Sequence, residues 1–300
     1  MRDNPVARTS WATIGAIAWL PFLLFRLPSS FFPAPSGLAP PRDVGSNGVM
    51  DRDQLVAYLD DLLEVDEVSD IALNGLQVGG RPEVERVATA VSASARLFTQ
   101  AAEWGADAVL VHHGLLWRGD VVRLVGSFRE RVRVLLENDL NLIAYHLPLD
   151  RHPAHGNAAV LARQLGLDGL EAFGTFEGVA LGVAGVFPTP VSDDELFNRV
   201  RTACGQQPQV FLGGPEVVAS VGIVTGGAPA GFDEAVAAGL DAFITGEARE
   251  WVMHRAEEEG VHFIAAGHYA TERFGVRSLG EFLSKRFDLE VRFFDIPNPV

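Results

Sequence analysis

The sequence has a single lysine, Lys285, and a single cysteine, Cys204, among its 300 residues. Its other basic side chains are arginines, and 24 basic residues stand against 39 acidic ones, so the formal net charge is −15. This charge disfavours general binding to nucleic acids, which needs a cationic surface that displaces counterions, and binding to anionic membrane surfaces. A lone cysteine excludes a disulfide bond within the chain, which suits a reducing compartment.

Several short catalytic motifs are also missing from the sequence. It contains no Gly-x-x-x-x-Gly-Lys-Ser/Thr motif, and its one lysine lies elsewhere, so a P-loop is excluded. A His-Glu-x-x-His motif and a nucleophile elbow are absent, and Cys204 is no candidate nucleophile. The chemistry must therefore come from side chains that are scattered along the chain.

The N-terminal 49 residues differ from the rest of the chain. Residues 11–25 form an apolar run between Arg8 and Arg26. This run is shorter than the roughly 20 residues of a membrane-spanning helix, although its length fits the core of a signal peptide. Because a Pro/Ser/Gly-rich stretch follows, we expect residues 1–49 to be a disordered leader or a mis-assigned start. The alternatives are a signal or anchor, or a structural element of the protein. We expect a cytoplasmic protein, with no membrane contact by residues 50–300.

From Met50 onward, segments with helical spacing of apolar residues alternate with short β-like runs. This alternation predicts an α/β protein with mixed or largely parallel sheets. The expected strands are residues 87–91, 108–111, 142–145, 179–186, 217–224, 242–245, 262–266 and 289–294. The expected helices are residues 52–64, 93–105, 128–138, 157–165, 192–203, 232–238, 250–259 and 271–287.

The sequence contains a faint internal echo. VATAVSAS, a helix and GADAVLVHHG resemble VGIVTGGA, a helix and GLDAFITGEA. Two related half-domains would explain this pattern, and so would the general likeness of any two βαβ units.

Residues that commonly bind metals follow three of the predicted strands, where open α/β sheets place their sites. They are His112 with His113, Asp150, and His268 with Glu272. Imidazoles and carboxylates suit Zn, Fe, Mn, Co or Ni, and the spacing of His268 and Glu272 puts both on one helical face. Each group alone also fits a surface pair or a turn cap, so the prediction rests on their combination.

Four further side chains could take part. Glu247 is a candidate general acid or base, or else a cap of the following helix. His146 could orient a metal ligand, or it could be a core histidine. His152 and His155 lie in a Pro/Gly-rich loop, where we expect them to be solvated.

A glycine-rich segment precedes one predicted helix. Gly226, Gly227 and Gly231 could cradle a phosphate group at the N-terminus of that helix. However, Asp233 and Glu234 already occupy its first turn and should repel an anion. We therefore do not expect a phosphate site there.

Five motifs together resemble the GTP cyclohydrolase I type 2 homolog family, also called NIF-three-like proteins. They are DIALNGLQVG at 70–79, HHG at 112–114, YHLPLDRHPAHGN at 145–157, TGE at 245–247 and GHYATE at 267–272. The resemblance runs from about residue 50 to residue 300, in order and with suitable spacing. One departure is Leu147, where many relatives have threonine; this position is not a metal ligand in the family.

The resemblance implies a dinuclear metal centre. Two divalent transition metal ions per chain would be held by His112, His113, Asp150, His268 and Glu272. The resemblance also implies two α/β domains and a homohexameric ring. We place the metal-site domain in residues 50–170 and 260–300, and the second domain in residues 171–259.

Three functions are compatible with such a centre. The first is a hydrolase that activates water and, by resemblance, opens the ring of GTP; Arg118 or Arg273 could then hold the triphosphate. The second is another metallohydrolase, such as a phosphoesterase, with a different small-molecule substrate. The third is a metal-binding ring or scaffold without catalysis. Ligand residues alone do not distinguish these functions, because they specify the metal site and leave the substrate open.

Overall fold

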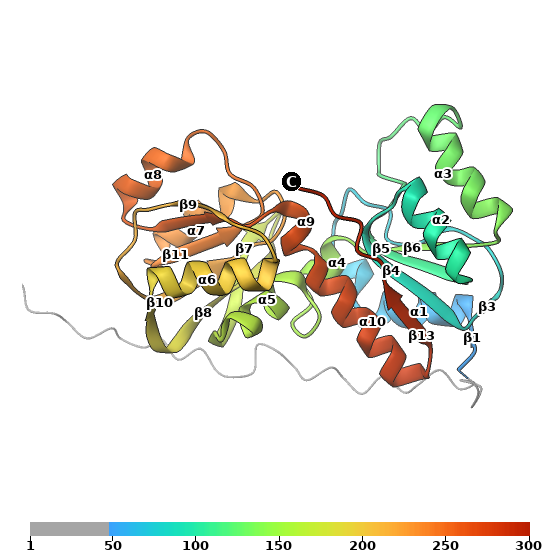
Figure 1. The fold of residues 1–300 in the computed structure, drawn as a ribbon, viewed down its shortest axis with the longest axis horizontal. Coiled ribbons are helices and arrows are strands. Elements are labelled where there is room, and N and C mark those ends of the chain that lie inside the picture. The colour runs from blue at the N-terminus through green and yellow to red at the C-terminus, as the bar shows by residue number, and fades with distance from the viewer. Residues whose placement is uncertain (1–47) are drawn as a thin grey trace, which may run out of the picture. The chain divides into compact units, whose positions relative to one another are not determined.

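The computed structural model describes residues 48–300 (Figure 1). Apart from Gly48 and Val49, the expected leader lies outside the described residues, as does the apolar run at 11–25. No helix within residues 48–300 combines the length and apolar character that a membrane crossing requires. The described chain forms two large mixed β-sheets with helices around them, which confirms the predicted α/β class.

Five strands form the first sheet: β2 (Gly75–Val78), β4 (Arg86–Ser92), β5 (Ala108–His113), β6 (Asn141–Ala144) and β13 (Glu290–Phe293). Their order is β13-β4-β5-β6-β2, with the first four parallel and β2 antiparallel to β6. A small ribbon of β1 (Met50–Asp51) and β3 (Glu83–Val84) accompanies this sheet. Since β13 comes from the end of the chain, the sheet is built from both chain ends, as predicted.

Six strands form the second sheet: β7 (Asp168–Phe176), β8 (Val179–Ser192), β9 (Gln209–Phe211), β10 (Val217–Ile223), β11 (Ala242–Thr245) and β12 (His262–Ala265). Their order is β7-β8-β10-β11-β12-β9. β10, β11 and β12 are parallel, and β8 and β9 run antiparallel to their neighbours. The carboxyl ends of the three parallel strands therefore meet at one edge of this sheet.

The second sheet differs from the expectation in the position of a domain boundary and in two strands that were not predicted, β7 and the short β9. β12 pairs with β11 along its whole length, so the domain boundary expected between residues 259 and 260 separates two strands of one sheet. β7 was not predicted at all, because its sequence, DGLEAFGTF, contains two glycines and is mostly exposed. A strand without a buried apolar face lacks the period-two pattern on which strand prediction depends.

The helices largely follow the sequence expectation. They are α1 (Arg52–Leu62), α2 (Ala95–Trp104), α3 (Gly126–Glu137), α4 (Leu147–Asp150), α5 (Asn157–Leu165), α6 (Asp193–Cys204), α7 (Phe232–Ala237), α8 (Val252–Glu259), α9 (His268–Thr271) and α10 (Arg273–Phe287), with 3₁₀ turns at Val65–Glu67 and Pro229–Gly231. Asp51 caps α1 by accepting hydrogen bonds from the N–H groups of Asp53 and Gln54. Gly105, with φ of 80°, ends α2.

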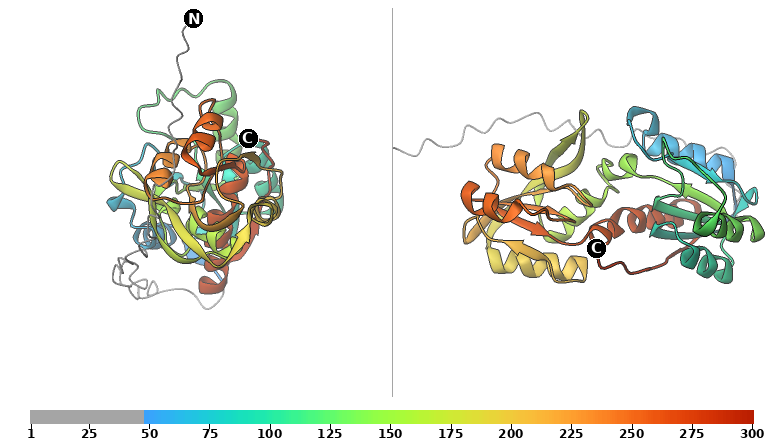
Figure 2. Two further views of the ribbon diagram at one scale, coloured as in Figure 1. Left: turned by 90° about the vertical axis from the view of Figure 1, so that its left-hand side faces the viewer. Right: turned by 90° about the horizontal axis from the view of Figure 1, so that it is seen from above.

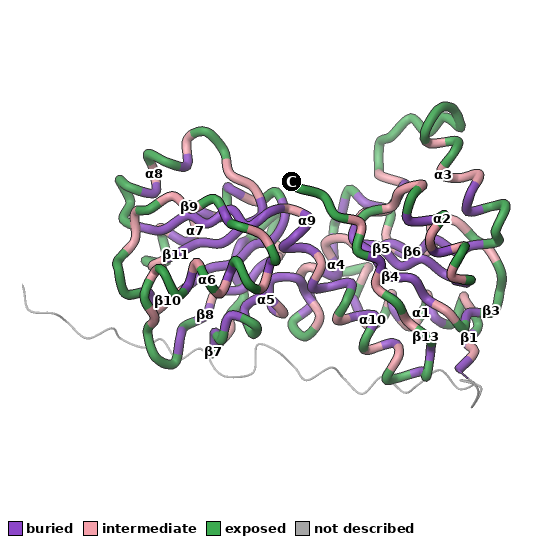
Figure 3. The backbone as a smooth tube through the Cα atoms, viewed as in Figure 1, coloured by how far each residue is buried: buried purple, intermediate pink, exposed green. Residues whose placement is uncertain are grey.

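The segment α9–α10 joins the cores of the two sheets. Ala270 and Phe274 belong to the apolar core beside the second sheet. Val276, Leu279 and Leu283 belong to the core beside the first sheet. Figure 3 shows buried stretches along α10. Figure 2 shows α10 running from the region of β12 toward the strands of the first sheet. This helix therefore brings residues that follow β12 to the ends of β5 and β6.

The internal echo extends to the topology and to specific hydrogen bonds. The series β4-β5-β6-β2 in the first sheet corresponds to β10-β11-β12-β9 in the second, with matching strand directions. Asp107 accepts hydrogen bonds from the backbone N–H groups of residues 85 and 86, and Asp241 accepts them from those of residues 219 and 220. These shared details favour the reading of two related half-domains.

Candidate metal centre

The carboxyl end of β5 presents two adjacent histidines. His112 is fully buried, and its Nδ1 lies 3.0 Å from the carbonyl oxygen of Tyr145. Because a carbonyl only accepts, Nδ1 carries the proton and Nε2 is left facing inward. His113 Nδ1 lies 3.1 Å from Ser92 Oγ, on the neighbouring strand β4, and the two imidazole rings are 4.6 Å apart.

Asp150 is the last residue of the short helix α4, which follows β6. Its Oδ1 accepts a hydrogen bond of 2.8 Å from Nδ2 of Asn157. Asn157 is fully buried, and its Oδ1 in turn accepts a bond of 2.6 Å from the N–H of Gly275 in α10. A chain of hydrogen bonds thus fixes Asp150 relative to α10, the helix that begins directly after Glu272.

The i, i+4 spacing of His268 and Glu272 predicted that both lie on one continuous helix. The structure differs, because the helix is interrupted at Glu272. Glu272, with φ of −104° and ψ of 5°, separates the single turn α9 from α10. Their side chains nevertheless meet, with 3.1 Å between His268 Nε2 and Glu272 Oε2. On its other side, His268 Nδ1 lies 2.6 Å from Oε1 of Glu247.

Glu247 has a different role from the predicted helix cap. The next helix, α8, begins only at Val252, and Trp251 occupies its N-cap position. Glu247 instead holds the outer nitrogen of His268, as carboxylates commonly do for metal-binding imidazoles. It therefore positions His268 in this structure, and its expected role as a general acid or base remains a prediction.

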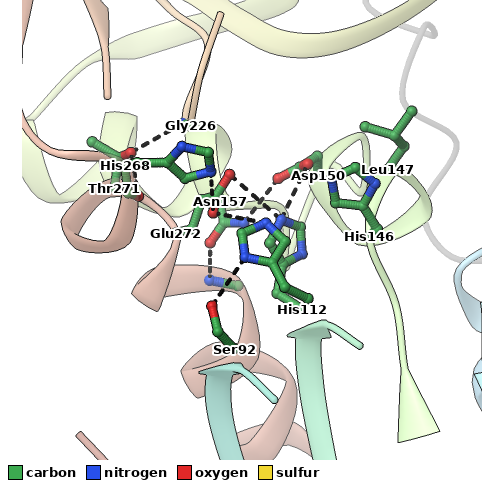
Figure 4. Close-up of polar contacts among 12 residues, drawn as sticks. Ser92, His112, His146, Leu147, Asp150, Asn157, Gly226, His268, Thr271 and Glu272 are labelled. Atoms are coloured by element: carbon green, nitrogen blue, oxygen red, sulfur yellow. Dashed lines mark hydrogen bonds and ion pairs between the residues drawn. The ribbon is translucent and has the colours of Figure 1, made fainter. Parts of the chain in front are cut away.

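The structure brings all five predicted ligand residues together. Figure 4 labels His112, Asp150, His268 and Glu272 among them. Oε1 of Glu272 lies 3.6 Å from Nε2 of His112, which is also 3.5 Å from Oδ2 of Asp150. The other oxygen of Glu272, Oε2, lies 3.2 Å from Nε2 of His113 and 3.1 Å from that of His268. Glu272 therefore stands between two groups of donor atoms. His146 also lies close enough to His112 and His113 for the three imidazoles to share an ion.

The nitrogen and oxygen atoms at this site are better placed to bind a cation than to form hydrogen bonds with one another. His112 Nε2 and Glu272 Oε2 are buried, and although polar atoms lie 3.1–3.6 Å from them, no hydrogen bond within the described residues satisfies either atom. Leaving such atoms unpaired costs about 1–3 kcal/mol each. Two donor atoms at about 2.1 Å from one ion in tetrahedral geometry would be roughly 3.4 Å apart, close to the spacings seen here. The residues at this site therefore fit divalent metal ions.

The charges in the cluster shift several pKa values. Burial lowers the pKa of His112, but the carboxylates of Asp150 and Glu272 outweigh this effect and raise it to about 9. The Glu272 carboxylate, which lies 3.1 Å from Nε2 of His268, raises the pKa of His268 to about 9 as well. Burial and the neighbouring His112 lower the pKa of His113 to about 3. Burial raises the pKa of Asp150, whereas the histidines around Glu272 outweigh its burial and hold its pKa low.

The motif at residues 70–79 holds the ligand-bearing loops in place. Asp70 accepts hydrogen bonds from the N–H groups of Ala72 and Leu147 and from the side chain of Asn74. The side chain of Gln77 bonds the backbone of residues 115 and 116, directly after the two histidines. A Cβ at Gly114 would lie 2.4 Å from Gln77 Oε1, so a larger residue there would displace the Gln77 side chain from these bonds. The structural roles of Asp70 and Gln77 could not be predicted from the sequence, because amide and carboxylate side chains are common in loops.

His146, His152 and His155 are neither purely apolar core residues nor fully solvated surface residues. His146 Nδ1 lies 2.9 Å from Oδ1 of Asp70, and its ring centroid is 5.0 Å from that of His112. His152 is buried, contrary to the expectation of a solvated residue, because its Nδ1 accepts the N–H groups of Ala154 and His155. His155 is half-buried beside Ser278.

The glycine segment of the second sheet lies against the site. Gly226 has φ of 69°, and a Cβ there would come 2.1 Å from Glu272 Oε1. Its N–H donates to Thr271 Oγ1, and its carbonyl accepts from the N–H of Gly246. The segment thus covers a predicted metal ligand, and we find no support for a phosphate cradle in it.

Comparison with known proteins agrees with these motifs. Residues 50–299 match the family described as Duf34/NIF3 (NGG1p interacting factor 3). The chain belongs to the Duf34/NIF3 family. The match covers almost all of the described residues, so the family likeness includes both sheets and the whole candidate site.

Curated relatives and solved structures extend the Duf34/NIF3 match. GTP cyclohydrolase 1 type 2 homologs from Pseudomonas aeruginosa and Escherichia coli K12 are each 44% identical, over 82% and 83% of this chain and 97% and 100% of the relative. The solved protein ybgI has a TM-score of 0.79 at 43% identity, and TTHA1606 from Thermus thermophilus has 0.76 at 39%. Both comparisons cover 84% of this chain and 100% of the other.

Proposed function

We propose that this Duf34/NIF3 protein is a metal-dependent hydrolase with two divalent transition metal ions per chain. The observation that carries the proposal is the position of Glu272, whose two oxygens face different sets of imidazole nitrogens. A single carboxylate between two donor sets is the usual arrangement of a bridging ligand. The buried, unpaired Nε2 of His112 and Oε2 of Glu272 support it.

We assign the predicted ligands to two positions. His112, Asp150 and Oε1 of Glu272 would hold one ion. His113, His268 and Oε2 of Glu272 would hold the other. The donors are nitrogen and oxygen only, which suits Zn, Fe, Mn, Co or Ni.

Bound at these positions, the ions would supply Lewis acidity and a water-derived nucleophile at neutral pH. The protein residues would do the rest. Glu247 orients His268 through Nδ1, and Asn157 orients Asp150. The N–H of Gly226 is held by Thr271, which keeps the glycine segment over Glu272.

The named relatives lead us to GTP as the first substrate to test, with hydrolytic opening of the purine ring. Of the two arginines considered for the triphosphate, Arg273 is engaged by the carbonyl oxygen of Cys204 and by Asp295. Arg118 is exposed, and its side chain has no hydrogen bond or ion pair within residues 48–300. Arg118 is therefore the better candidate to contact a phosphate group.

The test combines elemental analysis with turnover. The full chain is incubated separately with Zn, Fe, Mn, Co and Ni, and metal per chain is measured beside formate release from GTP. About two metals per chain with formate release would support the whole proposal. Two metals without turnover of GTP or of a panel of phosphoesters would favour a non-catalytic ring or scaffold. A well-folded chain that takes up no metal would overturn the proposal.

We also propose a cytoplasmic homohexamer, on the basis of the family resemblance. The single cysteine supports a reducing compartment. Exposed apolar side chains are consistent with an interface between copies, and several of them lie in two short segments: Ile71, Leu73, Val121, Val122, Leu124 and Val125. Light scattering should give six times the chain mass, and a monomeric mass would contradict this proposal.

A further inference from the structure

The two half-domains carry the same ligand pattern after corresponding strands. His146 and Asp150 follow β6, and His268 and Glu272 follow β12, with the carboxylate four positions after the histidine in each case. β6 and β12 occupy equivalent places in their sheets. His146 is therefore the counterpart of His268, although it was not among the predicted ligands.

The outer nitrogen of each histidine in the cluster is occupied. Nδ1 of His112 is bound by a backbone carbonyl and Nδ1 of His113 by Ser92. Nδ1 of His268 is bound by Glu247, and Nδ1 of His146 by Asp70. His146 is thus oriented in the same manner as the proposed ligands, with Nε2 as its free nitrogen.

Asp70 decides which nitrogen of His146 carries the proton. Burial raises the pKa of Asp70, but its hydrogen bonds, foremost that from His146, outweigh this effect and lower it to about 2. An ionised carboxylate has no proton to donate, so Nδ1 of His146 is the donor. In the neutral ring, Nε2 is then a hydrogen-bond acceptor.

One difference separates His146 from its counterpart. Nε2 of His268 lies 3.1 Å from its carboxylate, Glu272. His146 makes no such contact with Asp150; within the described chain, its one carboxylate partner is Asp70. Its side chain is 17% exposed, whereas that of His112 is completely buried. In Figure 4, His146 and His268 lie on opposite sides of His112.

An aromatic residue completes this side of the site. The ring of Trp117 lies edge-on to His146 at 5.3 Å between centroids and 6.2 Å from His113. A backbone bridge to Ala72 holds Trp117 beside the segment that also positions His146. Trp117 is half-buried, so it limits the space next to His146 without closing it.

We propose that His146 is a substrate-contacting residue, whose Nε2 accepts a hydrogen bond from an N–H or O–H group of a molecule bound at the metal pair. This inference rests on the proposed dinuclear centre and assigns to it the class of substrate: one with a donor group beside the atoms that bind the metals. Trp117 forms the wall next to that donor.

The test uses two small chelators of metal pairs. Acetohydroxamate has an N–H group next to its metal-binding oxygens, and N-methylacetohydroxamate is the same chelator without it. Their affinities for the metal-loaded full chain are measured by titration calorimetry, in wild type, His146→Phe, His146→Ala and the control His155→Phe. Metal per chain is measured for every sample.

We expect wild type and His155→Phe to prefer acetohydroxamate, and both His146 variants to lose about threefold to tenfold of that preference, the worth of one hydrogen bond. The variants should retain full metal, since Asp70 keeps its bonds to Ala72, Asn74 and Leu147. An unchanged preference, or the loss of a metal from both His146 variants, would overturn the inference while the dinuclear centre stands. A wild-type chain without metal would overturn both.

Discussion

Gly226 lies against Glu272 so closely that a Cβ at position 226 would come 2.1 Å from the carboxylate oxygen Oε1. Gly226→Ala should therefore displace Glu272 and weaken metal binding by about tenfold or more, the equivalent of a typical overpacking cost of about 1–3 kcal/mol. Gly239→Ala is the matched control, because Gly239 has a similar φ of 66° but nothing within 4 Å of its Cβ position. Chelator competition measures both. Equal effects of the two variants would mean that backbone strain alone matters.

Glu272 and Asp150 should differ in how many metals they hold. Glu272→Gln removes the carboxylate from both proposed positions, so we expect both metals to be lost on gel filtration. Asp150→Asn affects only the position beside His112, and about one metal per chain should remain. Elemental analysis gives the stoichiometry. One retained metal in both variants would show that Glu272 does not bridge.

Asn157 should contribute to stability through two buried hydrogen bonds. Asn157→Ala leaves Oδ1 of Asp150 and the N–H of Gly275 without their partner, which should cost about 1–3 kcal/mol of unfolding free energy. Urea unfolding measures this cost. Asn198→Ala, at an exposed helical position, should stay within about 0.5 kcal/mol of wild type. A similar small change for Asn157→Ala would contradict its proposed role.

Metal binding should release protons at neutral pH. His112 and His268 have pKa values raised to about 9, so each carries a proton at pH 7 that a metal ion at Nε2 must displace. Apparent affinity should therefore rise from pH 7 to about 9 and then level off. His113 has a pKa of about 3 and should release no proton. Calorimetry in buffers of different ionisation enthalpy detects the release, and a pH-independent affinity would exclude it.

Much of the fold could be predicted because buried strands leave a strong pattern. β5 and β11 each begin with a run of buried apolar residues, and both were located within two residues of their ends. The exposed strand β7 left no such pattern. The place of β12 could not be inferred either, because a local pattern shows that a strand exists and not which sheet it joins.

The part of the candidate site that could be predicted consists of residue types that commonly bind metals. His112, His113, Asp150, His268 and Glu272 are of ligand type and lie at or after the carboxyl ends of strands, and the structure brings them together. Asp70, Asn157 and Gln77 act by holding other groups, and such roles depend on distances between remote parts of the chain. The helix break at Glu272 was missed as well, since i, i+4 spacing suggests one regular helix.

The candidate ligands come from widely separated parts of the chain, and this has a consequence for how the protein is made. During synthesis, His112, His113 and Asp150 leave the ribosome well before His268 and Glu272. Until then the nascent chain presents an incomplete set of donors, without the carboxylate that stands between the two imidazole groups. We therefore expect the chain to bind its metals only after synthesis is complete. Prematurely terminated chains should then not compete with complete ones for the cell's supply of metal.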